Sequence, residues 1–71
     1  MSGGYSGKEV VRALRKIGFS IDHQRGSHLF MHNPEKNVSI VVPYHKEIKK
    51  GTLNNIVKKV GITFNDLKKL V

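Results

Sequence analysis

The chain has 71 residues, with 13 Lys and Arg against 5 Asp and Glu, so its formal net charge is +8. A chain of this length forms one small domain with a thin core, which excludes a large internal active-site cavity. Because it contains no Cys, disulfides, thiolate metal sites and cysteine nucleophiles are excluded as well, and a reducing compartment is expected.

Residues 1–5 show no periodicity, and we expect a flexible tail before a single domain over residues 6–71. Ser6 and Glu9 have the spacing of a capping box, which predicts a helix that begins here and stops at Gly18. Apolar residues then recur at helical spacing, and basic residues occupy the opposite arc. The apolar stripe is Val10, Ala13, Leu14 and Ile17, and the basic face is Lys8, Arg12, Arg15 and Lys16.

Three predicted strands follow the first helix. Phe19, Ile21 and His23 alternate with polar residues up to Arg25-Gly26, which predicts a half-buried strand. The second strand is His28–His32, with a turn over residues 33–37. The third strand is Val38–Val42. It ends at Pro43, which has no N–H to donate to a ladder and therefore lies at a strand end or on an edge strand. Together the three segments predict an antiparallel meander.

Two more helices complete the chain. A basic connection, Tyr44 to Lys50, leads into a helix that ends at Gly61, with an apolar stripe of Leu53, Ile56, Val57 and Val60. Thr63 and Asp66 predict the N-terminus of a short last helix with Phe64, Leu67 and Val71 on one side. These elements can bury their apolar faces only against each other. The predicted fold is a two-layer α+β domain, α-β-β-β-α with an additional short C-terminal helix.

The composition also bears on the class of partner and on the cellular compartment. A charge of +8 favours an anionic partner, which can be nucleic acid, an anionic membrane surface or an acidic protein. No apolar run approaches the ~20 residues that span a bilayer, and the first residues lack the regions of a signal peptide. We therefore expect a cytoplasmic protein without a membrane segment.

Carboxylate and metal chemistry find little support. Glu9 and Asp66 occupy capping positions, and the other acidic residues are scattered over different elements. His28 and His32 lie four residues apart on a strand, about 13 Å at ~3.3 Å per residue, which is too far to share an ion. His23 and His28 could face each other across a tight hairpin, but two imidazoles without a third ligand make a poor zinc site. We expect neither a metal nor a cofactor.

The segment from Gln24 to His28 combines a basic side chain, a glycine, a hydroxyl and an imidazole at a solvent-facing hairpin end. An RNA phosphodiester contains its own nucleophile, the 2′-hydroxyl. Its cleavage therefore needs only a group that takes or gives a proton and cations that stabilise the transition state. A histidine, with an ordinary pKa of about 6.5, suits the proton transfer. His28 is the candidate.

The cations for such a site would be Arg25, Lys46, Lys49 and Lys50, provided that the connection after the third strand folds near the hairpin. The pattern alone favours a plainer interpretation, in which His28 begins a strand and the lysines solvate the surface. Phe30, with Leu29 and Met31, likewise fits core and sheet surface better than a base-stacking platform. The basic face of the first helix either follows phosphates or is simply exposed to solvent.

Six short motifs occur in order along the chain, from Ser6 to Thr63. They are Ser6-Gly7-Lys8-Glu9-Val10, Gly18-Phe19, Gly26-Ser27-His28, Val42-Pro43-Tyr44-His45, Ile48-Lys49-Lys50-Gly51-Thr52-Leu53 and Gly61-Ile62-Thr63. Each is weak alone. Their order and spacing, in a basic chain of this length, resemble the HicA family of bacterial and archaeal toxins, and the resemblance extends over Ser6–Val71.

The resemblance implies a double-stranded-RNA-binding-domain-like fold and a toxin that cleaves mRNA independently of ribosomes. The catalytic histidine of the family stands in the Gly-Ser-His motif, which is His28 here, with Gly26 and Ser27 shaping the turn that presents it. The resemblance also implies a HicB antitoxin that covers the catalytic surface and represses the operon.

The chain departs from the family pattern at three places. Many members carry a second histidine directly after the motif, where this chain has Leu29, and a proline before the Gly-Thr, where it has Lys50. The loop between His45 and Ile48 is slightly shorter than is common. These departures leave the Gly-Ser-His motif intact.

The combined prediction is a metal-independent endoribonuclease in which His28 is a general acid or base, and Arg25, Lys46, Lys49 and Lys50 hold phosphates. Such contacts make affinity depend steeply on salt and little on sequence. Two alternatives stay open. A non-catalytic RNA-binding module would tolerate His28→Ala, and a protein-interaction module for an acidic partner would have no affinity for RNA.

Overall fold

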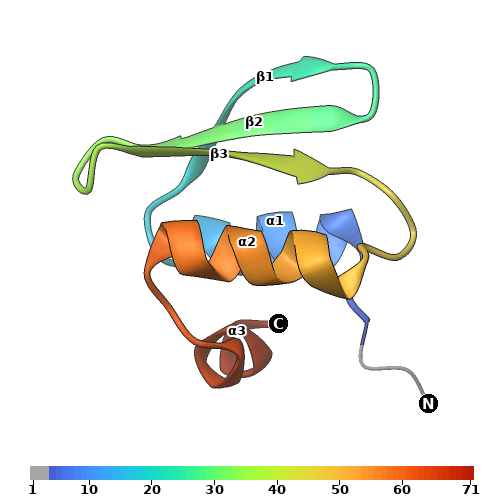
Figure 1. Cartoon of the computed structure of the whole chain (residues 1–71). Helices are drawn as coiled ribbons and strands as arrows, with labels where there is room; N and C mark the ends of the chain where they lie inside the picture. The colour runs from blue at the N-terminus through green and yellow to red at the C-terminus, as the bar shows by residue number, and fades with distance from the viewer. Residues whose placement is uncertain (1–3) are drawn as a thin grey trace.

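The computed structural model describes residues 4–71, which form a three-stranded sheet with two helices on one face and a short third helix on the side of those two helices away from the sheet (Figure 1). The helices are α1 (Gly7–Arg15), α2 (Lys50–Val60) and α3 (Phe64–Leu70), and the strands are β1 (Ser20–Arg25), β2 (His28–Asn33) and β3 (Val38–Pro43). The sheet is an antiparallel meander in the order β1-β2-β3. The predicted α+β class and order of elements are confirmed.

The predicted capping box at Ser6 is present, and Thr63, predicted to begin the last helix, forms a capping box as well. Ser6 N donates to Glu9 Oε1 at 2.9 Å and Glu9 N to Ser6 Oγ at 3.1 Å, and Thr63 and Asp66 form the same pair of bonds at the start of α3. These bonds satisfy backbone donors that the first helical turn leaves free. Gly61 ends α2 with a φ of 88°, as expected. α1 ends earlier than predicted, at Arg15, and Gly18 with its φ of 103° lies in the turn that follows.

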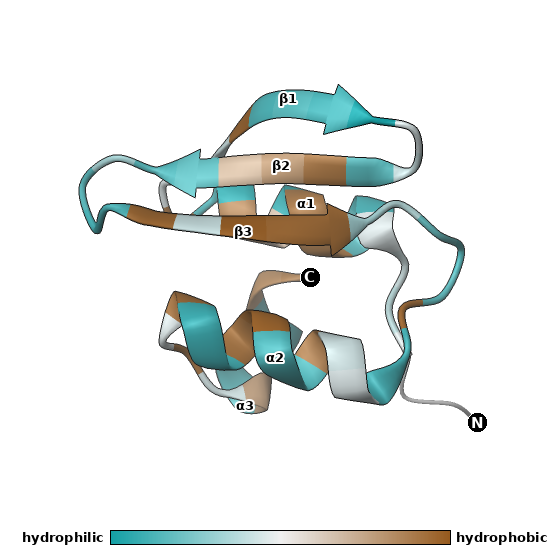
Figure 2. Ribbon diagram, turned by 45° about the horizontal axis from the view of Figure 1, so that its top comes forward, coloured by the Kyte–Doolittle hydropathy of each residue, from teal (hydrophilic) through white to brown (hydrophobic). Residues whose placement is uncertain are grey.

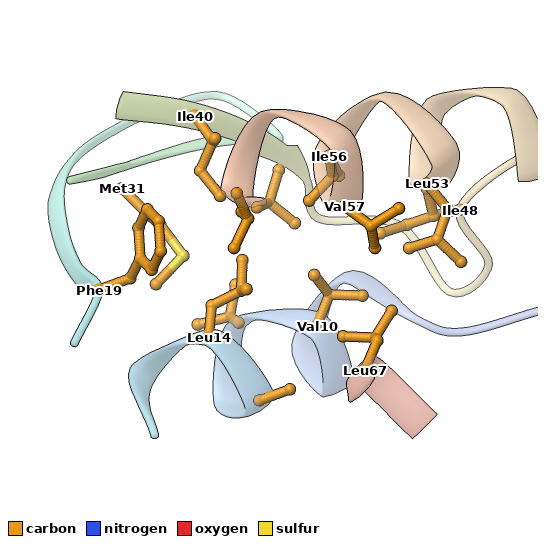
Figure 3. Packing of buried hydrophobic residues seen from close by; sticks show 14 of the residues in the cluster. Val10, Leu14, Phe19, Met31, Ile40, Ile48, Leu53, Ile56, Val57 and Leu67 are labelled. Atoms are coloured by element: carbon orange, nitrogen blue, oxygen red, sulfur yellow. The ribbon is translucent and has the colours of Figure 1, made fainter. Parts of the chain in front are cut away.

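The core lies between the helices and one face of the sheet (Figure 3). The predicted stripe of α2 is buried throughout, and Val10, Ala13 and Leu14 of α1 are fully buried. On the predicted apolar side of α3, Leu67 is buried. Phe64 and Val71, predicted on the same side, are 38% and 43% exposed.

The sheet is covered by helices only in part. Leu29, Met31, Ile40 and Val42 of β2 and β3 face the helices and are at most 4% exposed. All six residues of β1 are exposed, so the prediction of a half-buried first strand is wrong. Phe19 is buried, but it precedes the strand. Figure 2 shows the contrast: β1 is largely hydrophilic, whereas β3 is mostly hydrophobic. The helix layer is narrower than the sheet, so β1 extends beyond it.

The predicted tail, residues 1–5, falls mostly on residues 1–3, which lie outside the described residues. Tyr5 is partly buried against the core, and its carbonyl accepts from Ile48 N at 2.8 Å. Gly7 follows, buried, and its amide donates to His45 O at 2.9 Å. A Cβ at Gly7 would overlap the carbonyl oxygen of Pro43 and approach Tyr44 Cα to 2.7 Å. The start of α1 therefore packs directly on the connection between β3 and α2.

Candidate active site

The Gly-Ser-His motif forms the tight turn between β1 and β2. Arg25 and His28 are partners in the ladder, so Gly26 and Ser27 are the two loop residues. Gly26 has a φ of 56°, whereas Ser27 is not among the described residues with positive φ. Glycine at the first loop position followed by a residue of ordinary φ fits a type II′ hairpin turn. The side chain of Gln24 donates to Gly26 O at 2.8 Å and braces the turn.

His28 is the first residue of β2 and is exposed. Its neighbour Leu29 points into the helix-covered face, and side chains alternate along a strand. The imidazole therefore lies on the opposite face, which no helix covers. Arg25 is its partner on one side and Pro43 on the other. Within the described part of the chain, the imidazole has no hydrogen-bond partner, so both ring nitrogens are free for a ligand.

The sequence left open that His23 and His28 face each other across the hairpin. In the structure they are not partners in the ladder. An irregularity between Ile21 and His23 shifts the ladder, and His23 pairs with Phe30. The two rings stack with centroids 4.3 Å apart and planes 8° apart. His23 Nδ1 also lies 3.3 Å from Asp22 Oδ2. His23 is thus held by Phe30 and Asp22, one residue pair further along the open face from His28.

Lys46 lies in the connection between β3 and α2. It lines a hollow of about 280 Å³ together with Ser6, Lys8, Tyr44 and His45. The backbone joins this hollow to the turn, because Tyr44 N donates to Ser27 O at 2.6 Å. Figure 1 shows the β1–β2 turn, the connection after β3 and the N-terminal end of α1 at the same end of the molecule.

Lys49 and Lys50 line a different hollow. Lys49 is the N-cap of α2 and Lys50 its first residue. Both border a space of about 530 Å³ that also contacts Glu47, Leu53 and Phe64. This hollow shares no lining residue with the one at Lys46. Arg25 and His28 thus flank the turn, Lys46 lines the hollow that Tyr44 joins to the turn, and Lys49 and Lys50 line a separate hollow.

Tyr44 is a residue that sequence reasoning passed over. Its amide ties the connection after β3 to the turn, and its side chain is 43% exposed. The only local signal was its position directly after Pro43, where a strand must end. Its proximity to Ser27 arises from the fold, since the two residues are far apart in the sequence.

Residues 4–71 also bear on two other kinds of site. No three His, Asp or Glu side chains in this range come together as a metal ion would require. None of the helices described is both long and apolar enough to cross a bilayer.

Comparison with known proteins identifies the family. A comparison with curated proteins finds no match. The family model described as the HicA toxin of bacterial toxin-antitoxin systems matches residues 7–62, well over half of the chain. The matched range runs from α1 to the end of α2 and includes the whole sheet and His28. The sheet with helices on one face agrees with the double-stranded-RNA-binding-domain-like fold expected from the resemblance. The chain therefore belongs to the HicA toxin family of bacterial toxin-antitoxin systems.

Proposed function

We propose that this toxin is a metal-independent endoribonuclease that cleaves mRNA, with His28 as its general acid or base. The observation that carries the proposal is the position of His28. It is exposed, without a hydrogen-bond partner in residues 4–71, and directly beside Arg25 at the end of a hairpin. A net charge of +8 gives the surrounding surface the field that attracts a polyanion. An mRNA substrate also implies action in the cytoplasm.

The proposed reaction is an internal transfer within the RNA. The 2′-oxygen forms a bond to phosphorus while the bond from phosphorus to the 5′-oxygen of the next nucleotide breaks. The 2′-hydroxyl loses its proton, the departing oxygen gains one, and His28 performs one of these transfers. The products are a 2′,3′-cyclic phosphate and a 5′-hydroxyl. Arg25 holds the phosphate, whose negative charge grows in the transition state.

Gly26 and Ser27 have the role of presenting His28. A two-residue turn fixes the register of the two strands and thus the side of the sheet on which His28 lies. Lys46 is proposed to contact RNA phosphates near the turn. Lys49 and Lys50 are proposed to contact phosphates further along the strand, because they line a separate hollow.

A toxin of this family has an antitoxin as its partner, and we propose a HicB-type protein. Because His28 and Arg25 lie at an exposed hairpin end, a protein that covers the turn would block access of RNA to both side chains. The antitoxin would thus inhibit without altering the fold of the toxin.

The test is incubation of a long single-stranded RNA with purified protein in EDTA. We expect the wild type to cut the RNA and His28→Ala to lose activity by about 10²- to 10⁴-fold. His32→Ala is the matched control, since it removes an imidazole from the same face of the same strand and should cut as the wild type does. The same strand with 2′-deoxyribose should stay intact.

Three outcomes would reject the proposal. If His28→Ala cuts RNA as well as the wild type, His28 is not the acid or base. If neither protein cuts RNA but both bind it, the chain is a non-catalytic RNA-binding module. If the wild type binds an acidic protein tightly and has no affinity for RNA, the chain is a protein-interaction module.

A further inference from the structure

A groove of about 470 Å³ runs between α1 and the part of β1 that extends beyond the helix layer. It exists because no helix covers β1. Ile21 and Gln24 pair with Met31 and Leu29, whose side chains face the helices. The side chains of Ile21 and Gln24 therefore point to that same side but stay exposed, and Ile21 is 43% accessible.

One wall of the groove is cationic. It consists of exposed cationic side chains, and no carboxylate lines the groove: Lys8, Arg12 and Arg15 belong to α1, and Lys16 is its C-cap. Lys8 and Arg12 are separated by about 6 Å along the helix axis at ~1.5 Å per residue, and Arg15 follows after another turn. This step is close to the spacing of successive phosphates in an extended single strand.

The other wall and the floor are mostly apolar. Ile21, Leu29 and Tyr44 line it, and Gln24 adds one amide. An apolar wall with an exposed aromatic ring, opposite a row of cations, suits a strand that carries phosphates on one side and bases on the other.

The groove leads toward the candidate active site. Lys8 and Tyr44 line both this groove and the hollow that contains Lys46. Tyr44 is bonded through its amide to Ser27, next to His28. A chain that follows the row of cations from Arg15 to Lys8 is therefore brought to the hairpin turn.

We propose that the groove between α1 and β1 binds a segment of single-stranded RNA flanking the scissile phosphate. Lys8, Arg12 and Arg15 hold its phosphates, and Tyr44 stacks on a base. This inference rests on the proposed function and specifies how that function holds its substrate. Lys16 is not included among the phosphate-binding residues, because its Nζ donates to Leu70 O at 2.7 Å and so connects the end of α3 to the end of α1.

The experiment measures RNA binding without cleavage. A short fluorescein-labelled single-stranded oligoribonucleotide is titrated with His28→Ala protein and followed by fluorescence anisotropy at several salt concentrations. Lys8→Gln, Arg12→Gln and Arg15→Gln are combined in that background. The matched control combines Lys36→Gln, Lys58→Gln and Lys68→Gln, which removes the same charge from exposed positions outside the groove. Circular dichroism verifies the fold of each protein.

We expect the groove variant to raise Kd about tenfold or more and to reduce the slope of log K against log salt by about 2, since each lost phosphate contact removes about 0.7. The control variant should change Kd much less. Tyr44→Ser should weaken binding about tenfold, and Tyr44→Phe should restore it, because the stacking ring is the part that matters.

Equal losses in the groove and control variants would overturn the inference, because net charge alone would then explain binding. It would also be overturned if the groove variant kept its RNA affinity but lost binding to a poly-glutamate peptide, which would indicate an acidic protein as occupant. Cleavage by the otherwise wild-type protein is assayed separately. Loss of RNA binding in the groove variant while the wild type fails to cut RNA would support the groove and reject the nuclease.

Discussion

The two halves of the sheet differ in what they contribute. The inner face of β2 and β3 is packed against the helices, and Leu29, Met31, Ile40 and Val42 are at most 4% exposed. β1, in contrast, is exposed along its entire length. Burial of apolar surface is the main source of folding free energy. The covered half therefore holds the fold, and the β1–β2 hairpin is free to carry surface chemistry, with His28 at the junction of the two.

The largest expected difference in the free energy of unfolding is between Ile→Ala substitutions in the two halves of the sheet. Ile40→Ala, on β3, removes a side chain that is 3% exposed and should lower the free energy of unfolding by about 2–5 kcal/mol. Ile21→Ala, on β1, removes one that is 43% exposed and should cost less than about 1 kcal/mol. Urea unfolding followed by circular dichroism measures both. Equal losses would show that β1 belongs to the core.

Glycine substitutions sharpen the comparison by separating packing from backbone strain. A methyl group at Gly7 would overlap the backbone of Pro43 and Tyr44, so Gly7→Ala should cost about 1–3 kcal/mol. At Gly51, in the first turn of α2, a Cβ meets nothing within 4 Å. Gly51→Ala should therefore stabilise by up to about 1 kcal/mol. Thermal unfolding of both proteins checks this, and a neutral Gly7→Ala would contradict the close packing.

Gly26→Ala tests the hairpin by backbone strain alone. No atom lies within 4 Å of a Cβ at Gly26, but its φ is 56°. The expected cost is about 1–3 kcal/mol, because a side chain at this φ is strained. Thermal unfolding measures the cost, and RNA cleavage reports whether the turn still presents His28. An unchanged melting temperature for Gly26→Ala would mean that the turn adopts another conformation.

The smallest effect is expected at α3, remote from the hairpin. The hydrogen bond from Thr63 N, helped by the Thr63 hydroxyl and by Lys69, lowers the pKa of Asp66 below its ordinary value of 3.8. A depressed pKa in the folded state stabilises the fold above the unfolded-state pKa, and that stability is lost as the pH falls through the folded-state pKa. Asp66→Asn should therefore flatten the dependence of the melting temperature on pH below about 4. A variant with the wild-type acid dependence would show that this carboxylate does not contribute.

Local signals in the sequence predicted the helices well. The capping boxes at Ser6 and Thr63, the left-handed Gly61 and the stripe of α2 depend on residues within a few positions of each other. The exposure of β1 could not be predicted in this way. Alternation tells which side chains share a face, but not whether a helix reaches far enough to cover it.

In the candidate site, too, the features set by local residues could be predicted and those set by long-range packing could not. The turn at Gly26-Ser27 and the exposure of His28 follow from local residue types. Three other features could not be predicted, because each depends on packing between distant segments. They are the irregularity that places His23 against Phe30, the contact of Tyr44 with Ser27, and the groove beside α1.

The most direct measurement is the free energy of unfolding and the rate of RNA cleavage in EDTA, made on the same preparations of wild type and His28→Ala. His28 is exposed on the open face, so the substitution should change stability by less than about 0.5 kcal/mol. Cleavage should fall by about 10²- to 10⁴-fold. Cleavage at the wild-type rate, or a loss of cleavage that accompanies unfolding, would contradict the assignment of catalysis to the hairpin and of stability to the covered half of the sheet.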